Sequence, residues 1–301
     1  MSSTNAILLC FDIFAFIWGA VIGSFLNVVV WRVPRGESIS HPGSHCPKCG
    51  HRIRPWENIP VISWLFLRGK CSQCHLPISW HYPAGEAAVG LLFWALWHKT
   101  ISAGLPVSTV LGWWWLAAAM LTCARIDIAH RIIPDAVTLP SFIVAVLLSL
   151  GFPAGRPAIA GLNMHTAVLW PDTMLQTIRG ALPAPWGMHA AALTDCLAGA
   201  LGGALIIAAV RFLGKCYLNH LQRKGITPLP PEAMGLGDLK LVAAIGAFTG
   251  LTSCIYIIAC GALLATVWGI AASFHRPQRR LSQLPFAPFL GAAALLRLLL
   301  L

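Results

Sequence analysis

Long apolar segments recur along the whole chain, and they constrain its fold more than any other feature. Hydrophobic residues make up 57% of the 301 residues and charged residues only 10%, whereas soluble domains carry about 25% charged residues. An apolar run of about 17 to 25 residues is long enough to cross a bilayer as a helix. Candidate spans occupy residues 6–31, 83–98, 104–124, 136–152, 191–213, 238–250, 253–274 and 284–301. The sequence therefore predicts an all-α polytopic membrane protein with about eight transmembrane helices.

Two of these segments have features beyond their apolar length. The segment 238–250 is short and contains Gly246 and Gly250, so a partly submerged helix is an alternative to a full crossing. The segment 6–31 has no basic residue ahead of it and is too long for a signal-peptide core. We therefore expect it to be retained as the first transmembrane helix.

The distribution of basic residues predicts the orientation in the membrane. Arginines and lysines gather in the loop 32–82 and in alternate loops after it, while Lys99, Arg156 and Arg179 are the few in the remaining loops. Because basic loops stay in the cytoplasm, the loop 32–82 is expected there. This topology also accounts for the net charge of +11. The charges are spread over four loops, so a nucleic-acid-binding face is not expected.

These expectations divide the chain into three parts. Residues 1–31 form a first transmembrane helix, residues 32–82 a small cytoplasmic loop domain, and residues 83–301 a membrane-embedded domain. A periplasmic loop is expected near residues 153–190, where proline and alanine are frequent.

Four of the ten cysteines stand in two C-x-x-C pairs within the loop 32–82. They are Cys46, Cys49, Cys71 and Cys74. Two such pairs can complete a tetrahedral shell of four thiolates around Zn²⁺. A cytoplasmic loop keeps its thiols reduced, which argues against two disulfides. An iron-centred site or a pair of redox motifs remains an alternative.

Four protein ligands leave no open coordination position, so a zinc ion here is expected to be structural. Nearby histidines, which we interpret as surface polar residues, are His41, His45, His51 and His75. The other six cysteines lie singly in or beside apolar spans, where cysteine behaves as a small hydrophobic residue.

Aspartates and glutamates are scarce, which makes each of them informative. Asp127 lies at the end of the third span and Asp238, in the sequence GLGD, at the start of the sixth. The two are expected at the same depth on the same side of the membrane. An aspartic hydrolase needs such a pair, because one carboxylate takes a proton from water while its protonated partner polarises the scissile carbonyl. Two carboxyl groups this close would share one proton.

Structural roles are the alternatives for these acids. Asp238 can be a helix N-cap, and Asp127 an interfacial acid near Arg125 and Arg131. Asp135 follows a proline and is interpreted as a cap. Two further acids, read as first-turn charges near helix ends, are Glu86 and Asp195.

Five motifs in order resemble those of type IV prepilin peptidases, which are bifunctional leader peptidases and N-methyltransferases. The motifs are GSFLNVVVWRVP (23–34), the double C-x-x-C loop, ISWHYPAGE (78–86), IDIAHRIIPDAVTLP (126–140) and GLGDLKLVAAIG (235–246). The resemblance implies that Asp127 and Asp238 are the catalytic aspartates of an intramembrane aspartyl protease. His81 stands where the family commonly carries arginine.

The same resemblance implies the substrates, the cofactor and the cellular location. Substrates would be type IV prepilins or type II secretion pseudopilins, with a basic leader and an apolar helix that enters from the lipid bilayer. Cleavage would occur at the cytoplasmic face of the bacterial inner membrane, and S-adenosyl-L-methionine would methylate the new N-terminal residue. Positions that match family motifs near a donor or substrate site are Asn27, Arg32, Gly69 and Glu86.

Two other classes of protein remain open from the sequence. A transporter with a zinc-stabilised cytoplasmic loop would use Asp127 and Asp238 as ion or proton sites. A binding module without catalysis would tolerate Asp238→Asn. The peptidase explains the order of all five motifs, whereas each alternative explains single ones.

Overall fold

The computed structural model describes residues 3–156, 171–183, 185–225, 234–275 and 284–300. Every regular element in these ranges is a helix, accompanied by isolated β-bridges. The expected all-α class is therefore confirmed. The chain divides into two compact units, Met1–Ala103 and Gly104–Leu301.

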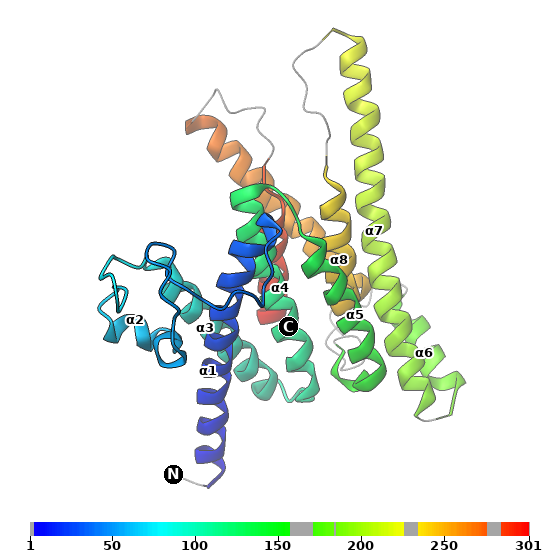
Figure 1. Cartoon of the computed structure of the whole chain (residues 1–301). Coiled ribbons are helices and arrows are strands. Elements are labelled where there is room, and N and C mark those ends of the chain that lie inside the picture. Colours follow the sequence, from blue (N-terminus) through cyan, green and yellow to red (C-terminus); the bar gives the residue numbers. More distant parts are fainter. Residues whose placement is uncertain (1–2, 157–170, 184, 226–233, 276–283, 301) are drawn as a thin grey trace. The chain divides into compact units, whose positions relative to one another are not determined.

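The first unit is a helix pair whose two members are connected by a small loop region, which lies beside the pair (Figure 1). α1 (Ser3–Arg32) and α3 (His81–Ser102) are antiparallel, since the ring of Phe11 contacts that of Trp97 while Asn27 donates to the carbonyl of Tyr82. Glycine allows the close approach: a Cβ on Gly19 would lie 2.7 Å from the Cβ of Phe93. The connecting region holds the short elements η1 (Val33–Arg35), η2 (Pro55–Asn58) and α2 (Ile62–Phe66).

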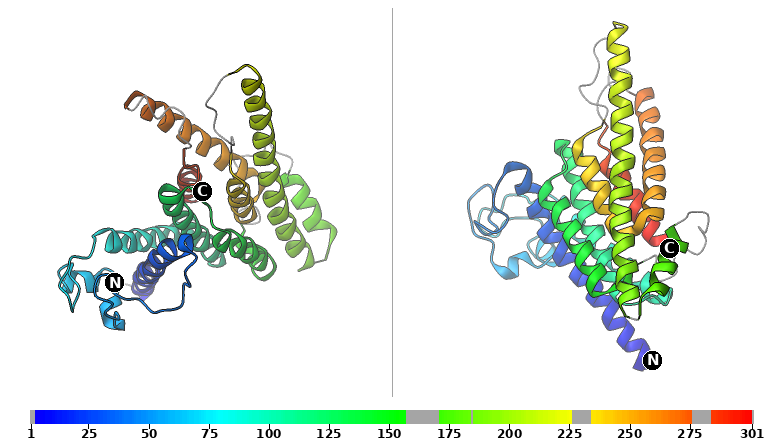
Figure 2. Two further views of the ribbon diagram at one scale, coloured as in Figure 1. Left: turned by 45° about the horizontal axis from the view of Figure 1, so that its top comes forward. Right: turned by 90° about the vertical axis from the view of Figure 1, so that its right-hand side faces the viewer.

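The second unit is built from the remaining helices. They are α4 (Ser108–His130), α5 (Asp135–Gly151), the 3₁₀ turn η3 (Pro153–Gly155), α6 (Pro171–Ala181), α7 (Trp186–Arg223), α8 (Leu236–His275) and α9 (Ala287–Leu300). Figure 2 shows the long α7 beside the first part of α8. The two run antiparallel, and at Gly199 and Gly246 their backbones touch because neither position has a side chain.

Within the described part of the chain, four helices are long and apolar enough to span a membrane, and their ranges are Ala6–Arg35, Ser108–His130, Trp186–Arg223 and Leu236–Ala272. Two shorter apolar helices, α5 and α9, accompany them. This set indicates a multi-pass membrane protein. The expected spans 238–250 and 253–274 are both parts of α8, which is interrupted at Gly250 (φ 78°, ψ 170°). α7 extends well beyond the expected span 191–213.

The expected loop at 153–190 contains η3 and the helix α6. Its residues 157–170 lie outside the described part of the chain.

Candidate catalytic dyad and metal centre

Asp127 lies in the last turn of α4 and is only 6% exposed. Its Oδ2 accepts a hydrogen bond from the N–H of Ala287 at 3.0 Å. Ala287 is the first residue of α9, and the first N–H groups of a helix have no partner within the helix. The Asp127 carboxylate therefore caps α9 while it remains near the end of its own helix.

Asp238 lies in the first turn of α8 and is partly exposed. Its Oδ2 accepts a hydrogen bond from the N–H of Gly235 at 3.2 Å. Asp238 therefore lies inside α8, and its carboxylate bonds to the residue that precedes the helix. An N-cap, which is the structural alternative from the sequence, would lie outside the helix.

The chain between α4 and α5 brings these two helix ends together. Ile133 packs directly on Gly237, where an added Cβ would lie 2.9 Å from the Ile133 Cβ. Asp135 at the start of α5 pairs with Lys240, two residues after Asp238. The carboxyl groups of Asp127 and Asp238 are close enough for their charges to interact. Two acids that are far apart in sequence therefore share one region of the second unit.

The structure corrects three structural readings of acids. Asp135 is the first residue of α5, whose N-cap is Pro134, and its carboxylate accepts a hydrogen bond from Lys240. Glu86 lies one turn inside α3, and its carboxylate accepts the N–H of Val61 at 2.8 Å. Asp195 lies well inside α7 and pairs with Arg156. In all three cases the carboxylate bonds to a residue that is distant in the sequence. Sequence reasoning alone does not reveal such partners.

The Arg156–Asp195 pair is a site that sequence reasoning missed. In the sequence Arg156 is one of the basic residues of an expected loop, yet it is 6% exposed and Asp195 is 4% exposed. The available signal was the position of Asp195 within an apolar run, where a carboxylate needs a partner.

The four cysteines of the first unit gather at one point. Their Sγ atoms all lie within 4.8 Å of one another, and the pairs Cys46–Cys74 and Cys49–Cys71 are each separated by 3.9 Å. Four thiolates at about 2.3 Å from a tetrahedral zinc ion would be about 3.8 Å apart. The cluster therefore fits a metal such as zinc.

Two matching turns build this cluster. In the first, the N–H of Gly50 bonds to the carbonyl of Cys46, and in the second the N–H of His75 bonds to the carbonyl of Cys71. Gly50 and His75 both have positive φ, at 72° and 56°. This turn directs backbone N–H groups at the first sulfur of each pair.

These N–H groups also favour the thiolate form of the first cysteine in each pair. The N–H groups of Cys49 and Lys48 lower the pKa of Cys46 to about 7. Those of Cys74 and Gln73 lower the pKa of Cys71. A thiolate is the ligand form of cysteine, so this backbone arrangement favours metal binding.

The flanking histidines do not belong to the four-sulfur cluster. His51 Nε2 instead lies 3.3 Å from a carboxylate oxygen of Glu57. The N–H of Arg54 and the hydroxyl of Ser72, followed by His51, lower the pKa of Glu57.

The four positions suggested for the donor or substrate site are distributed within the first unit. Asn27 of α1 donates to the carbonyl of Tyr82 at 3.4 Å, and Glu86 lies one turn further along α3. A Cβ on Gly23 would lie 2.9 Å from the Cα of Glu86, so Asn27 and Glu86 occupy adjacent turns of the same helix interface.

Arg32 and Gly69 have different surroundings. Arg32 is 7% exposed and donates to the carbonyl of Ser38 at 2.9 Å. Gly69 has φ of 67°, and an added Cβ would lie 2.8 Å from the ring of Trp64. Glycine is therefore required there for conformation and for space.

Comparison with known proteins places these features in a family. Residues 17–100 match the model of the bacterial Peptidase A24 N-terminal domain. A prepilin leader peptidase/N-methyltransferase of Stutzerimonas stutzeri is 30% identical over 97% of this chain and 91% of its own length. The protein of that name from Burkholderia pseudomallei (strain 1026b) is 30% identical over 93% of this chain and 82% of its own.

A third relative, from Pseudomonas aeruginosa, has the same name and is 30% identical over 97% of this chain and 91% of its own length. No solved structure matches the chain. The similarity to these relatives covers 93% to 97% of the chain and so extends over both units. This chain belongs to the prepilin leader peptidase/N-methyltransferase family.

Proposed function

We propose that the chain removes the leader peptide of type IV prepilins, type II secretion pseudopilins or both, with Asp127 and Asp238 as the catalytic dyad. The observation that carries this proposal is the packing of the turn after α4 on the start of α8, which brings the chain segments of Asp127 and Asp238 into one region of the second unit. The names of the relatives support the class of substrate.

In the proposed chemistry the two carboxyl groups hold one proton between them. The ionised carboxylate accepts a proton from water, and the resulting hydroxide attacks the carbonyl carbon of the leader's last residue. The protonated carboxyl group donates a hydrogen bond to the carbonyl oxygen. When the C–N bond breaks, a proton passes to the leaving amine, so that one water is consumed and a carboxylic acid and an amine are formed.

The proposed membrane topology places this chemistry at the cytoplasmic face of the inner membrane. About eight crossings with the basic loop 32–82 inside would put the end of α4 and the start of α8 on that side. A substrate with a basic leader and an apolar helix would then present its cleavage point at this face. Most of its helix would stay in the bilayer.

The first unit would hold the second activity. S-adenosyl-L-methionine would supply the methyl group for the new N-terminal amine. Asn27, Arg32, Gly69 and Glu86 are proposed to shape the donor or substrate site. The four cysteines would hold Zn²⁺ as a structural ion, which stabilises a loop region that has little hydrophobic core of its own.

A mass-spectrometric assay tests this function. Purified protein in lipid is incubated with a prepilin, with and without S-adenosylmethionine, in water enriched in ¹⁸O. We expect a shortened chain, one added methyl group only with the donor, and one ¹⁸O atom in the carboxylate of the leader from the first turnover onwards. An uncleaved prepilin would contradict the proposal. A first turnover with ¹⁶O alone would mean that an enzyme carboxylate attacks directly, in place of water.

A further inference from the structure

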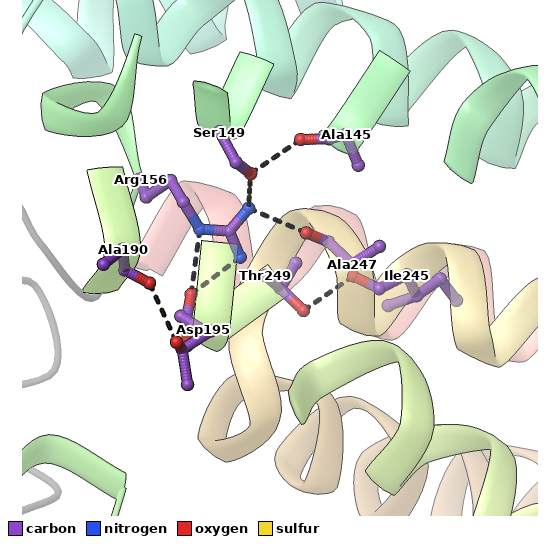
Figure 3. Close-up of polar contacts among 9 residues, drawn as sticks. Ala145, Ser149, Arg156, Ala190, Asp195, Ile245, Ala247 and Thr249 are labelled. Atoms are coloured by element: carbon purple, nitrogen blue, oxygen red, sulfur yellow. Dashed lines mark hydrogen bonds and ion pairs between the residues drawn. The ribbon is translucent and has the colours of Figure 1, made fainter. Parts of the chain in front are cut away.

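Arg156 is bound by three helices of the second unit at once. Its Nε and Nη2 donate to Asp195 of α7 at 3.0 and 2.7 Å, and its Nη1 donates to Ser149 of α5 at 2.9 Å and to the carbonyl of Ala247 in α8 at 2.8 Å. Figure 3 shows the guanidinium between these groups. Because the ion pair is buried, its hydrogen bonds are not in competition with water.

The bond to Ala247 is explained by the break in α8. In an uninterrupted helix the carbonyl of Ala247 would accept the N–H of Leu251. Gly250 has φ of 78° and ψ of 170°, so the helical hydrogen-bond pattern cannot continue across it. Arg156 supplies a donor to the carbonyl that the break releases.

Asp195 fits the same break from the opposite side. A Cβ added to Gly250 would collide with Oδ1 of Asp195 and lie 2.8 Å from its Oδ2. The carboxylate thus lies against the backbone of Gly250, at the start of the second helical segment of α8, where helix N–H groups favour an anion. Arg156 and Asp195 together hold both sides of the interruption.

The break is the fixed end of the segment that carries Asp238. Residues 236–249 form an uninterrupted helix, which at a rise of about 1.5 Å per residue is roughly 21 Å long. Contacts of Gly199 with Gly246 and of Gly203 with Val242 hold this segment against α7 along its length. A shift of its Gly250 end would therefore be transmitted to Asp238 at the other end.

We infer that Arg156 and Asp195 are positioning residues for the aspartate dyad: they fix the break at Gly250 and thereby the depth at which α8 presents Asp238. This inference rests on the proposed peptidase function. Neither residue touches the substrate in this account. Their effect is on the turnover of bound substrate.

The decisive variant is the neutral double substitution Arg156→Met/Asp195→Asn. A single substitution would leave a buried charge without its partner, whereas removal of both charges avoids that cost. We expect kcat for prepilin cleavage to fall at least tenfold with KM within twofold, while the thermal midpoint of the protein in lipid stays close to that of the wild type. Arg179→Met is the matched control, since Arg179 of α6 is exposed, and it should keep the wild-type kcat.

A purely structural pair would give another pattern. The double variant would then keep both the stability and the activity of the wild type. A kcat within twofold of wild type would therefore overturn the inference. A change in KM alone would also overturn it, because it would indicate a role in substrate binding.

Ser149→Ala removes one neutral hydrogen bond from the guanidinium and serves as the test if the double variant does not accumulate. It should lower kcat about two- to fivefold with KM unchanged, and an unchanged kcat would contradict the inference. Failure of the wild type to cleave would refute the peptidase proposal itself, which is a separate outcome.

Discussion

The ammonium group of Lys240 lies 2.7 and 2.8 Å from the two carboxylate oxygens of Asp135. This ion pair joins the start of α5 to the start of α8. Asp135 follows the turn after Asp127, and Lys240 follows Asp238 by two residues. The pair therefore links the two chain segments that carry the proposed dyad.

Lys240→Met should lower kcat about fivefold and change stability little. Both side chains are about half exposed, at 44% and 54%, and exposed ion pairs contribute only about 0–1 kcal/mol. Asp135→Asn should have the same effect, and the double variant should be no worse than either single one. Kinetics of prepilin cleavage test this, with Lys215→Met on α7 as the control. Fully additive losses would show that the two residues act independently.

Gly199→Ala should destabilise the second unit by about 1–3 kcal/mol, as expected for an overpacked contact. The added Cβ would collide with the carbonyl of Gly246, and backbone cannot move aside easily. Gly202→Ala is the matched control on the same helix, because its Cβ would meet only the flexible end of Leu251. Thermal unfolding in lipid gives both values. Equal effects would argue against the close contact of α7 and α8.

Cys71→Ser should abolish stoichiometric zinc binding, since a tetrahedral structural site needs all four thiolates. Cys216→Ser should retain the metal, because Cys216 is an exposed residue of α7. Elemental analysis of the purified variants measures zinc per chain. The proposal of a zinc site fails if Cys71→Ser and the control bind equal amounts.

The thiol of Cys46 should titrate near pH 7 in protein stripped of metal, because backbone N–H groups stabilise its thiolate. An ordinary cysteine titrates near pH 8.5. Since folding lowers this pKa, the ionised thiol stabilises the folded turn above about pH 8.5, and that contribution is lost as the pH falls through about 7. The difference in thiolate absorbance between wild type and Cys46→Ser measures the midpoint. A midpoint near 8.5 would contradict the hydrogen bonding of the turn.

The sequence predicted those features that depend on composition and local spacing. Apolar length predicted the helical membrane class, and the repeated C-x-x-C spacing predicted the four-sulfur cluster. The short length of 238–250 indicated an unusual segment, which the structure shows as the part of α8 that ends in the break at Gly250.

Features that depend on long-range contacts could not be predicted in this way. Arg156 and Asp195 are far apart in sequence, and only the packing of α5, α7 and α8 brings them together. The same is true of Asp135 and Lys240. In each case the residue's own neighbours suggested a local role, such as a cap or a loop charge, while a distant partner determines its actual role.

The most direct test of the central claim compares prepilin cleavage by the wild type with that by Asp127→Asn and Asp238→Asn. Asp12→Asn serves as the control, because Asp12 is a carboxylate of α1 in the other unit. Product mass is read at matched protein amounts in lipid. We predict that each dyad variant lowers kcat by at least a thousandfold while Asp12→Asn cleaves at the wild-type rate. Wild-type cleavage by either Asp127→Asn or Asp238→Asn would show that these aspartates are not the catalytic pair.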